Sequence, residues 1–154
     1  MPGEFYIEGK KEKVDISQIL DNQSELKAKS DAIRSQTDKL AGLSPVSGSV
    51  AQDWIAESNV VLIGNAGTRH KVHSLLISIH NLVGTAITVR LYLPINGVER
   101  KVYEQVFDAT SDPPGLWIIN GTVGICNALR VTLQSNNADD SGKVIDYDYM
   151  LEAM

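Results

Sequence analysis

Residues 86–107, AITVRLYLPINGVERKVYEQVF, decide the fold class of this chain. Two runs rich in aliphatic and β-branched residues, 86–95 and 99–107, flank Asn96-Gly97, and an Asn-Gly pair in this position is a strong signal for a hairpin turn. Similar short runs on both sides, separated by turn residues, occupy 59–64, 70–80, 115–121, 122–126, 128–135 and 143–152, with a second Asn-Gly pair at 120–121. About eight short strands with no helix between them predict a mainly β fold for residues 54–154, an antiparallel β-sandwich of jelly-roll type.

Residues 15–41 carry a helical pattern instead. Apolar side chains recur every seven residues as the d positions of a coiled coil would, whereas the a positions after Ile16 are polar. The stripe is narrower than that of a helix packed on its own domain, which predicts an N-terminal coiled-coil helix. The predicted oligomer seam consists of Ile16, Ile19, Gln23, Leu26, Ser30, Ile33, Thr37 and Leu40.

The polar a positions weaken this seam, so we expect it to align the copies while the following domain contributes to assembly. Small polar core residues suit the wider axis of a three-stranded bundle, which favours a homotrimer over a dimer. A single amphipathic helix that lies on the β-domain is the alternative.

The two remaining segments are expected to lack regular structure. Residues 1–14 are predicted to form an extended arm, in which Phe5, Tyr6 and Ile7 make an apolar cluster that a partner could bury. The alternative is that these three residues fold back on their own protein. Residues 42–53, GLSPVSGSVAQD, are predicted to be a flexible linker because they are rich in Gly, Ser and Pro.

The two tryptophans are assigned different environments. Trp117 lies in an apolar run and is predicted to be a core residue. Trp54 lies where the predicted linker meets the domain, so it is expected to pack at that joint or against a neighbouring subunit. An exposed aromatic side chain could instead stack on a sugar ring.

The composition of the chain argues against some classes of binding partner. The chain of 154 residues is long enough for one ordinary domain with an appendage, and its net charge of −5 argues against a nucleic-acid-binding surface. No apolar run approaches the roughly 18–20 residues that cross a bilayer, and the first residues lack the apolar core of a secretory signal. The single cysteine, Cys126, cannot form an internal disulfide. We therefore expect synthesis in the cytosol and neither nucleic acid nor membrane as a partner.

The residues able to bind metal do not form a recognisable site. His70 and His73 are three positions apart, on opposite faces of a strand, and His80 follows without a matching Cys or His pair, so no metal ligand is predicted. Asp139 and Asp140 lack the alternating spacing of a calcium loop. A solvated turn is preferred for these two acids.

No catalytic residue or cofactor is predicted either. Asp146 and Asp148 share one face of the last strand, and such paired acids suggest glycoside hydrolysis only inside a cleft lined by aromatic side chains. A polar strand face is the preferred interpretation, and a small hydrolase is the alternative. No nucleophile elbow or phosphate-binding loop is present in the sequence, so a non-enzymatic protein is expected.

The order of segments resembles that of the virion accessory proteins of tailed bacteriophages, namely head fibres, capsid decoration proteins and short tail spikes. The residues that carry the resemblance are the arm PGEFYIEGKKEKVDI, the Ser/Thr/Gln-containing heptads of 16–40 and the β-domain from 54 onward. The resemblance implies that residues 1–14 anchor the chain to the major capsid protein or another virion protein, that a trimeric coiled coil acts as a spacer, and that the β-domain is displayed on the surface of the particle. It implies a structural protein made in the host cytoplasm. A receptor- or glycan-binding module at a fibre tip is the alternative.

Overall fold

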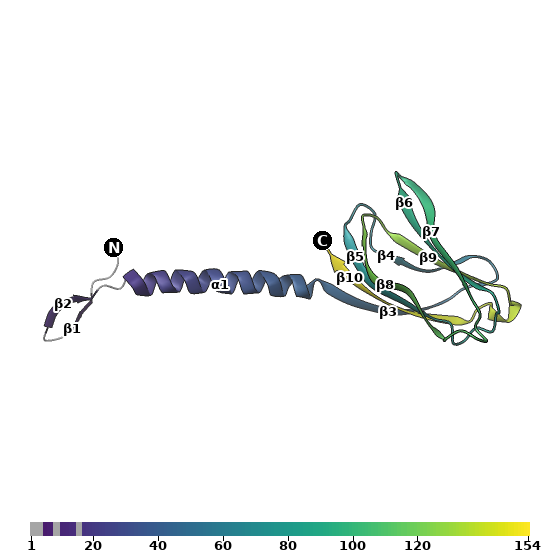
Figure 1. The fold of residues 1–154 in the computed structure, drawn as a ribbon, viewed down its shortest axis with the longest axis horizontal. Helices are drawn as coiled ribbons and strands as arrows, with labels where there is room; N and C mark the ends of the chain where they lie inside the picture. The colour runs from purple at the N-terminus through teal and green to yellow at the C-terminus, as the bar shows by residue number, and fades with distance from the viewer. Residues whose placement is uncertain (1–4, 8–9, 15–16) are drawn as a thin grey trace. The chain divides into compact units, whose positions relative to one another are not determined.

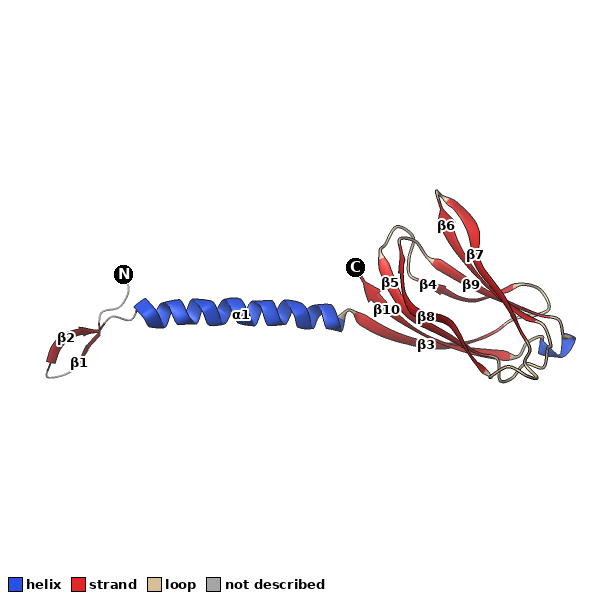
Figure 2. Cartoon of the chain, in the orientation of Figure 1, coloured by secondary structure: helices blue, strands red, loops and turns tan. Residues whose placement is uncertain are grey.

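The computed structural model describes residues 5–7, 10–14 and 17–154. The chain divides into two compact units, Met1–Ala41 and Gly42–Met154, and each is considered on its own. The first unit contains two short strands and one helix, and Figure 2 shows that strands make up nearly all regular structure of the second. The elements of the first unit are β1 (Phe5–Ile7), β2 (Lys10–Val14) and α1 (Ser17–Ala41).

The arm predicted to be extended contains an antiparallel strand pair. Strand β1 pairs with β2, with Phe5 opposite Val14 and Tyr6 opposite Lys13. In a single extended arm the backbone N–H and C=O groups could bond only to water, whereas pairing lets them bond to each other. This explains why a strand pair replaces the predicted extended arm. The helical prediction for residues 15–41 is met over the described range by α1, whose 25 residues include no proline or glycine.

Eight strands form the second unit, called the β-domain below. They are β3 (Leu43–Ala51), β4 (Ser58–Ile63), β5 (His70–Ser78), β6 (Ile87–Ile95), β7 (Val98–Phe107), β8 (Gly115–Ile125), β9 (Leu129–Ser135) and β10 (Val144–Ala153), with a short helix η1 (Ala138–Asp140) before β10. Two antiparallel sheets result, in the orders β3-β10-β5-β8 and β4-β9-β6-β7 (Figure 1). The prediction of a mainly β, antiparallel fold is confirmed.

The first Asn-Gly pair makes the predicted hairpin turn, and the second does not. Asn96 and Gly97 have φ values of 51° and 76°, as a two-residue turn between β6 and β7 requires, and Ile95 pairs with Val98. Residues 120–121 lie inside β8, because β5 pairs with β8 on both sides of them. A long neighbouring strand has therefore overridden the local turn signal.

The prediction of a flexible linker at 42–53 is wrong. Strand β3 pairs with β10 along its whole length, from Leu43 opposite Glu152 to Ala51 opposite Val144. Gly48 permits this pairing, because a Cβ atom at that position would overlap the Tyr147 side chain. The Gly and Ser residues that suggested a flexible segment thus belong to an edge strand, and the β-domain begins at Gly42 instead of residue 54.

One hydrophobic core lies between the inner faces of the two sheets. Trp54 is completely buried in it, and its indole Nε1 donates a hydrogen bond of 2.7 Å to the carbonyl oxygen of Lys143. The prediction that Trp117 is a core residue is wrong, since its side chain is 57% exposed. Its neighbours Leu116 and Ile118 take the inward positions of β8, and the alternation of a strand turns Trp117 outward. The largest fully buried side chains are Trp54, Ile63, Leu75, Ile77, Ile79, Ile87, Leu129, Leu133, Ile145, Val72, Val89 and Val131.

Asp140 is a buried hydrogen-bond acceptor that joins separate loops, so the prediction of a solvated turn is wrong for this residue. Its carboxylate accepts from the backbone N–H groups of Val83 at 2.8 Å and Gly84 at 3.0 Å, and from the Ser135 hydroxyl at 2.6 Å. Burial alone raises the pKa of Asp140, but these hydrogen bonds and one from Lys143 outweigh it and lower the pKa overall. The carboxylate is therefore held in its charged form.

Replacing Asp140 with Asn is expected to lower the free energy of unfolding by about 1–3 kcal/mol at neutral pH, because an amide cannot replace the carboxylate as acceptor for all three donors. Since folding lowers the pKa of Asp140, its contribution is present above the unfolded pKa of about 3.9 and is lost as the pH falls through the folded value. Urea unfolding at a series of pH values measures both effects. The matched control is Asp139→Asn at the exposed neighbouring position, and an equal loss of stability in both variants would contradict the role given to Asp140.

Candidate functional site

Helix α1 presents apolar side chains that its own unit does not bury. Ile19, Leu26 and Ile33 are 56%, 67% and 65% exposed, and they lie seven residues apart on one face. The predicted a-position residues Gln23, Ser30 and Thr37 are also exposed. Ile16 lies outside the described residues, and Leu40 is placed in the helix without a described side chain.

The predicted anchor residues occupy the first strand. Phe5, Tyr6 and Ile7 form β1, and the pairing with β2 fixes their backbone position only. Their side chains lie outside what is described, so the apolar cluster stays a prediction.

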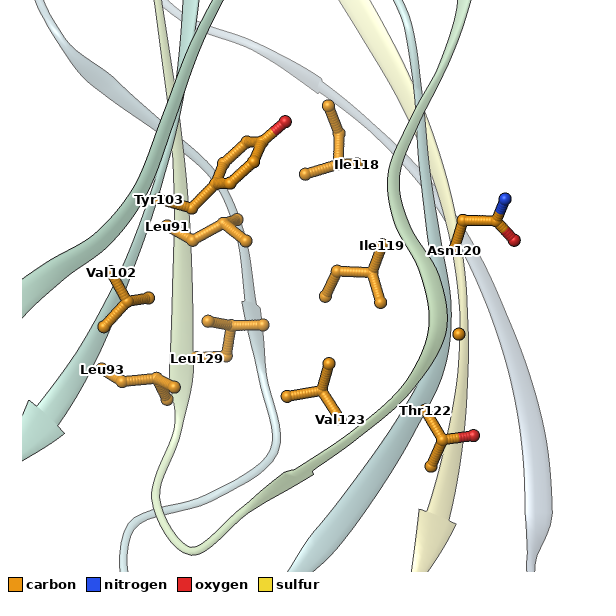
Figure 3. Close-up of a pocket in the computed structure, with 11 residues that line it drawn as sticks. Leu91, Leu93, Val102, Tyr103, Ile118, Ile119, Asn120, Thr122, Val123 and Leu129 are labelled. Carbon is orange, nitrogen blue, oxygen red and sulfur yellow. The ribbon is translucent and has the colours of Figure 1, made fainter.

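The β-domain contains an apolar pocket between its two sheets (Figure 3). Its volume is about 380 Å³, and its walls come from β6, β7 and β8 together with the first residue of β9. Figure 3 shows side chains of β6 and β7 facing those of β8 across the cavity, while Asn120 and Thr122 of β8 point away. No charged residue lines this pocket, so it offers mainly hydrocarbon contacts, with the hydroxyl of Tyr103 as a polar group. Its main apolar lining residues are Leu91, Leu93, Val102, Tyr103, Ile119 and Val123.

The mouth of the pocket continues into exposed apolar side chains on the β6–β7 hairpin. In Figure 1 this hairpin extends beyond the neighbouring strands at one end of the β-domain. Leu93 lines the pocket and pairs with Arg100, and Ile95 pairs with Val98, so paired side chains share the inner face. Ile95, Val98 and Val102 are 55%, 51% and 45% exposed. We name this face, formed by Leu93, Ile95, Val98, Arg100 and Val102, the hairpin surface.

A second exposed apolar area lies on the outer face of the sheet β3-β10-β5-β8. Trp117 of β8 pairs with Leu76 of β5, and Leu76 pairs with Asp148 of β10, which places the three in one row across the sheet. Met150 follows two residues after Asp148 on the same face. We name this area, formed by Leu76, Trp117, Asp148 and Met150, the sheet surface. Sequence reasoning missed it because an apolar run does not reveal which of its residues face outward.

The outer face of the other sheet is covered by ion pairs. Arg90 contacts Glu57 at 3.1 Å and Glu104 at 2.6 Å, and Arg130 contacts Glu99 at 2.7 Å. The hydrogen bond from Arg130 lowers the pKa of Glu99. The two arginines of this face are thus neutralised within the chain, which makes the face a poor site for an anionic partner.

The three histidines are separated by the fold. His70 is buried, whereas His73 faces outward and its Nε2 lies 2.7 Å from a carboxylate oxygen of Glu152, so the two do occupy opposite faces as predicted. His80 is exposed and its Nδ1 lies 2.8 Å from the hydroxyl of Ser78. Among the described residues, no three His, Cys, Asp or Glu side chains are grouped so that they could hold a metal ion.

The paired acids of β10 differ in their surroundings. Asp146 accepts a hydrogen bond of 2.6 Å from the Ser49 hydroxyl and lies 4.0 Å from Nδ1 of His80. Asp148 is exposed and has no hydrogen-bond or ion-pair partner within the described part of the chain. Both lie on the outer face of the sheet, as the alternation predicted.

No protein-family model and no curated protein matches the sequence. Within the ranges that the structure describes, no helix is both long enough and apolar enough to cross a membrane.

Proposed function

We propose that this chain is a non-enzymatic structural protein of a tailed-bacteriophage particle. In this proposal it forms a homotrimer, docks through residues 1–14 to the major capsid protein or another virion protein, and displays its β-domain on the particle surface. The observation that carries the proposal is the row of exposed apolar side chains on α1, because such a seam on a long helix is buried when like helices pair.

In this proposal the β-domain is a β-sandwich of jelly-roll type, and α1, which precedes it in the sequence, is a coiled-coil helix. Support comes from the strand orders β3-β10-β5-β8 and β4-β9-β6-β7, in which β3, β4, β5 and β6 alternate between the sheets. Eight-stranded double-sheet jelly rolls occur in viral capsid and lectin domains, so this likeness raises the expectation of a virion role by analogy of fold.

The seam is tested by replacing Leu26 and Ile33 together with lysine in the full chain. Each apolar side chain buried between helices contributes about 1.5–3 kcal/mol, so the concentration at which the trimer dissociates should rise at least about tenfold. Light scattering coupled to size exclusion over a range of concentrations gives the mass. The control is Leu20→Lys, which also changes an exposed leucine of α1 but lies off the seam. A wild-type chain that is monomeric at all concentrations would contradict the proposal.

The anchor is tested by deleting residues 1–14. The shortened chain should remain trimeric but no longer bind purified particles that lack the protein, because the arm alone is assigned to docking. Co-sedimentation with the particles measures binding, and the full chain is the positive control. Binding retained after the deletion would exclude the arm as the anchor.

A receptor- or glycan-binding module is the second candidate, and exposed Trp117 favours it. A sugar ring stacks on an aromatic face of this kind, and Asp148 in the same row could accept hydrogen bonds from hydroxyl groups. A glycan array probed with the wild type should then show bound glycans that Trp117→Ala loses and Trp117→Phe partly keeps. An array without any signal from the wild type would dismiss this candidate.

A further inference from the structure

The hairpin surface and the sheet surface are the two exposed apolar areas of the β-domain that each carry one unpaired charge. On the hairpin surface the charged residue is Arg100, which forms no ion pair within the described residues. On the sheet surface it is Asp148. The other acids on this outer face are engaged, Asp146 with Ser49 and Glu152 with Lys71 and His73. The two surfaces are therefore complementary in charge and alike in their apolar character.

We propose that the hairpin surface of one copy of this chain docks on the sheet surface of the next copy, with Arg100 paired to Asp148. The proposal rests on the homotrimer proposed above and names where its β-domains meet. Ile95, Val98 and Val102 would pack against Leu76, Trp117 and Met150, which removes both areas from water together. Aromatic side chains and arginine are the residues that most often anchor a protein interface.

The docking can close a ring of copies. When the hairpin surface and the sheet surface of one copy meet two different neighbours, the contact is heterologous and closes into a ring if the rotation between copies permits. A two-fold contact would also pair Arg100 of each copy with Asp148 of the other, so the choice of three copies rests on the three-stranded helix seam proposed above. Three equivalent Arg100–Asp148 contacts would complete a trimer.

Docking would also cover the mouth of the apolar pocket. Val102 belongs both to the pocket lining and to the hairpin surface, and Val123 on the facing strand β8 is 40% exposed. A neighbouring copy seated on the hairpin would shield these side chains. The pocket is then part of the subunit contact, with no separate small-molecule ligand required.

Charge reversal in the full chain tests the pairing. Arg100→Asp and Asp148→Arg should each raise the concentration at which the trimer dissociates by at least tenfold, and the double variant should return it to within about threefold of the wild type. Sedimentation velocity over a dilution series gives these values. Both residues are exposed and unpaired in the single chain, so the fold should be unaffected, which circular dichroism checks. The control is Arg69→Asp, an exposed arginine outside both surfaces.

Tryptophan fluorescence gives an independent readout. Trp54 is completely buried, so quenching by acrylamide reports on Trp117. Quenching should be weak in the wild-type trimer and clearly stronger in Arg100→Asp at the same chain concentration. A trimer in which Trp117 is quenched as readily as in the variant would overturn the docking, and would leave the sheet surface open for a glycan.

The outcomes separate this inference from the function on which it rests. A monomeric wild type contradicts the proposed trimer and the docking alike. If the wild type is a trimer and neither single variant changes the concentration at which it dissociates, the docking is overturned. The trimer itself would stand, and α1 would then hold it together. If the single variants weaken the trimer and the double variant does not restore it, the Arg100–Asp148 pairing is overturned. A wild type that forms a dimer overturns the ring.

Discussion

The β-domain buries the apolar surface between its two sheets, and each unit of the chain also carries an apolar surface that it does not itself bury. One runs along α1 and the other lies at the β6–β7 hairpin and around Trp117. Removing apolar surface from water contributes roughly 25 cal/mol per Å², and contiguous exposed patches commonly mark contacts with other molecules. The proposed trimer and the proposed docking of β-domains both follow from this one constraint.

Contacts inside the β-domain join parts of it that are distant in the sequence. Trp54 ties the segment after β3 to the residue before β10, and Asp140 ties the loop before β10 to the segment between β5 and β6. Gly48 lets β3 lie against β10 where Tyr147 needs space. Because the contacts of Trp54 and Asp140 include no residue of the hairpin surface or the sheet surface, substitutions on these surfaces can change assembly without changing the fold.

Sequence patterns predicted well those features that depend on neighbouring residues. The hairpin at 86–107, the seven-residue repeat on a helix and the alternation of the last strand all appear in the structure, although the contact between helices stays a proposal. The failures share one cause. The segment 42–53, the Asn-Gly pair at 120–121 and Asp140 each take their structure from residues distant in the chain, and no local pattern contains that information.

The sequence by itself therefore determined the class of fold, the positions of most strands and the face of α1 that carries apolar side chains, because the periods of strands and helices are local properties. Only the tertiary structure decided that a Gly- and Ser-rich segment would become an edge strand, since β10 supplies its hydrogen bonds from nearly the other end of the β-domain. It also decided that Trp117 faces water while Trp54 does not. The register between strands sets which side of a strand meets the core, and that register depends on all the strands of the sheet together.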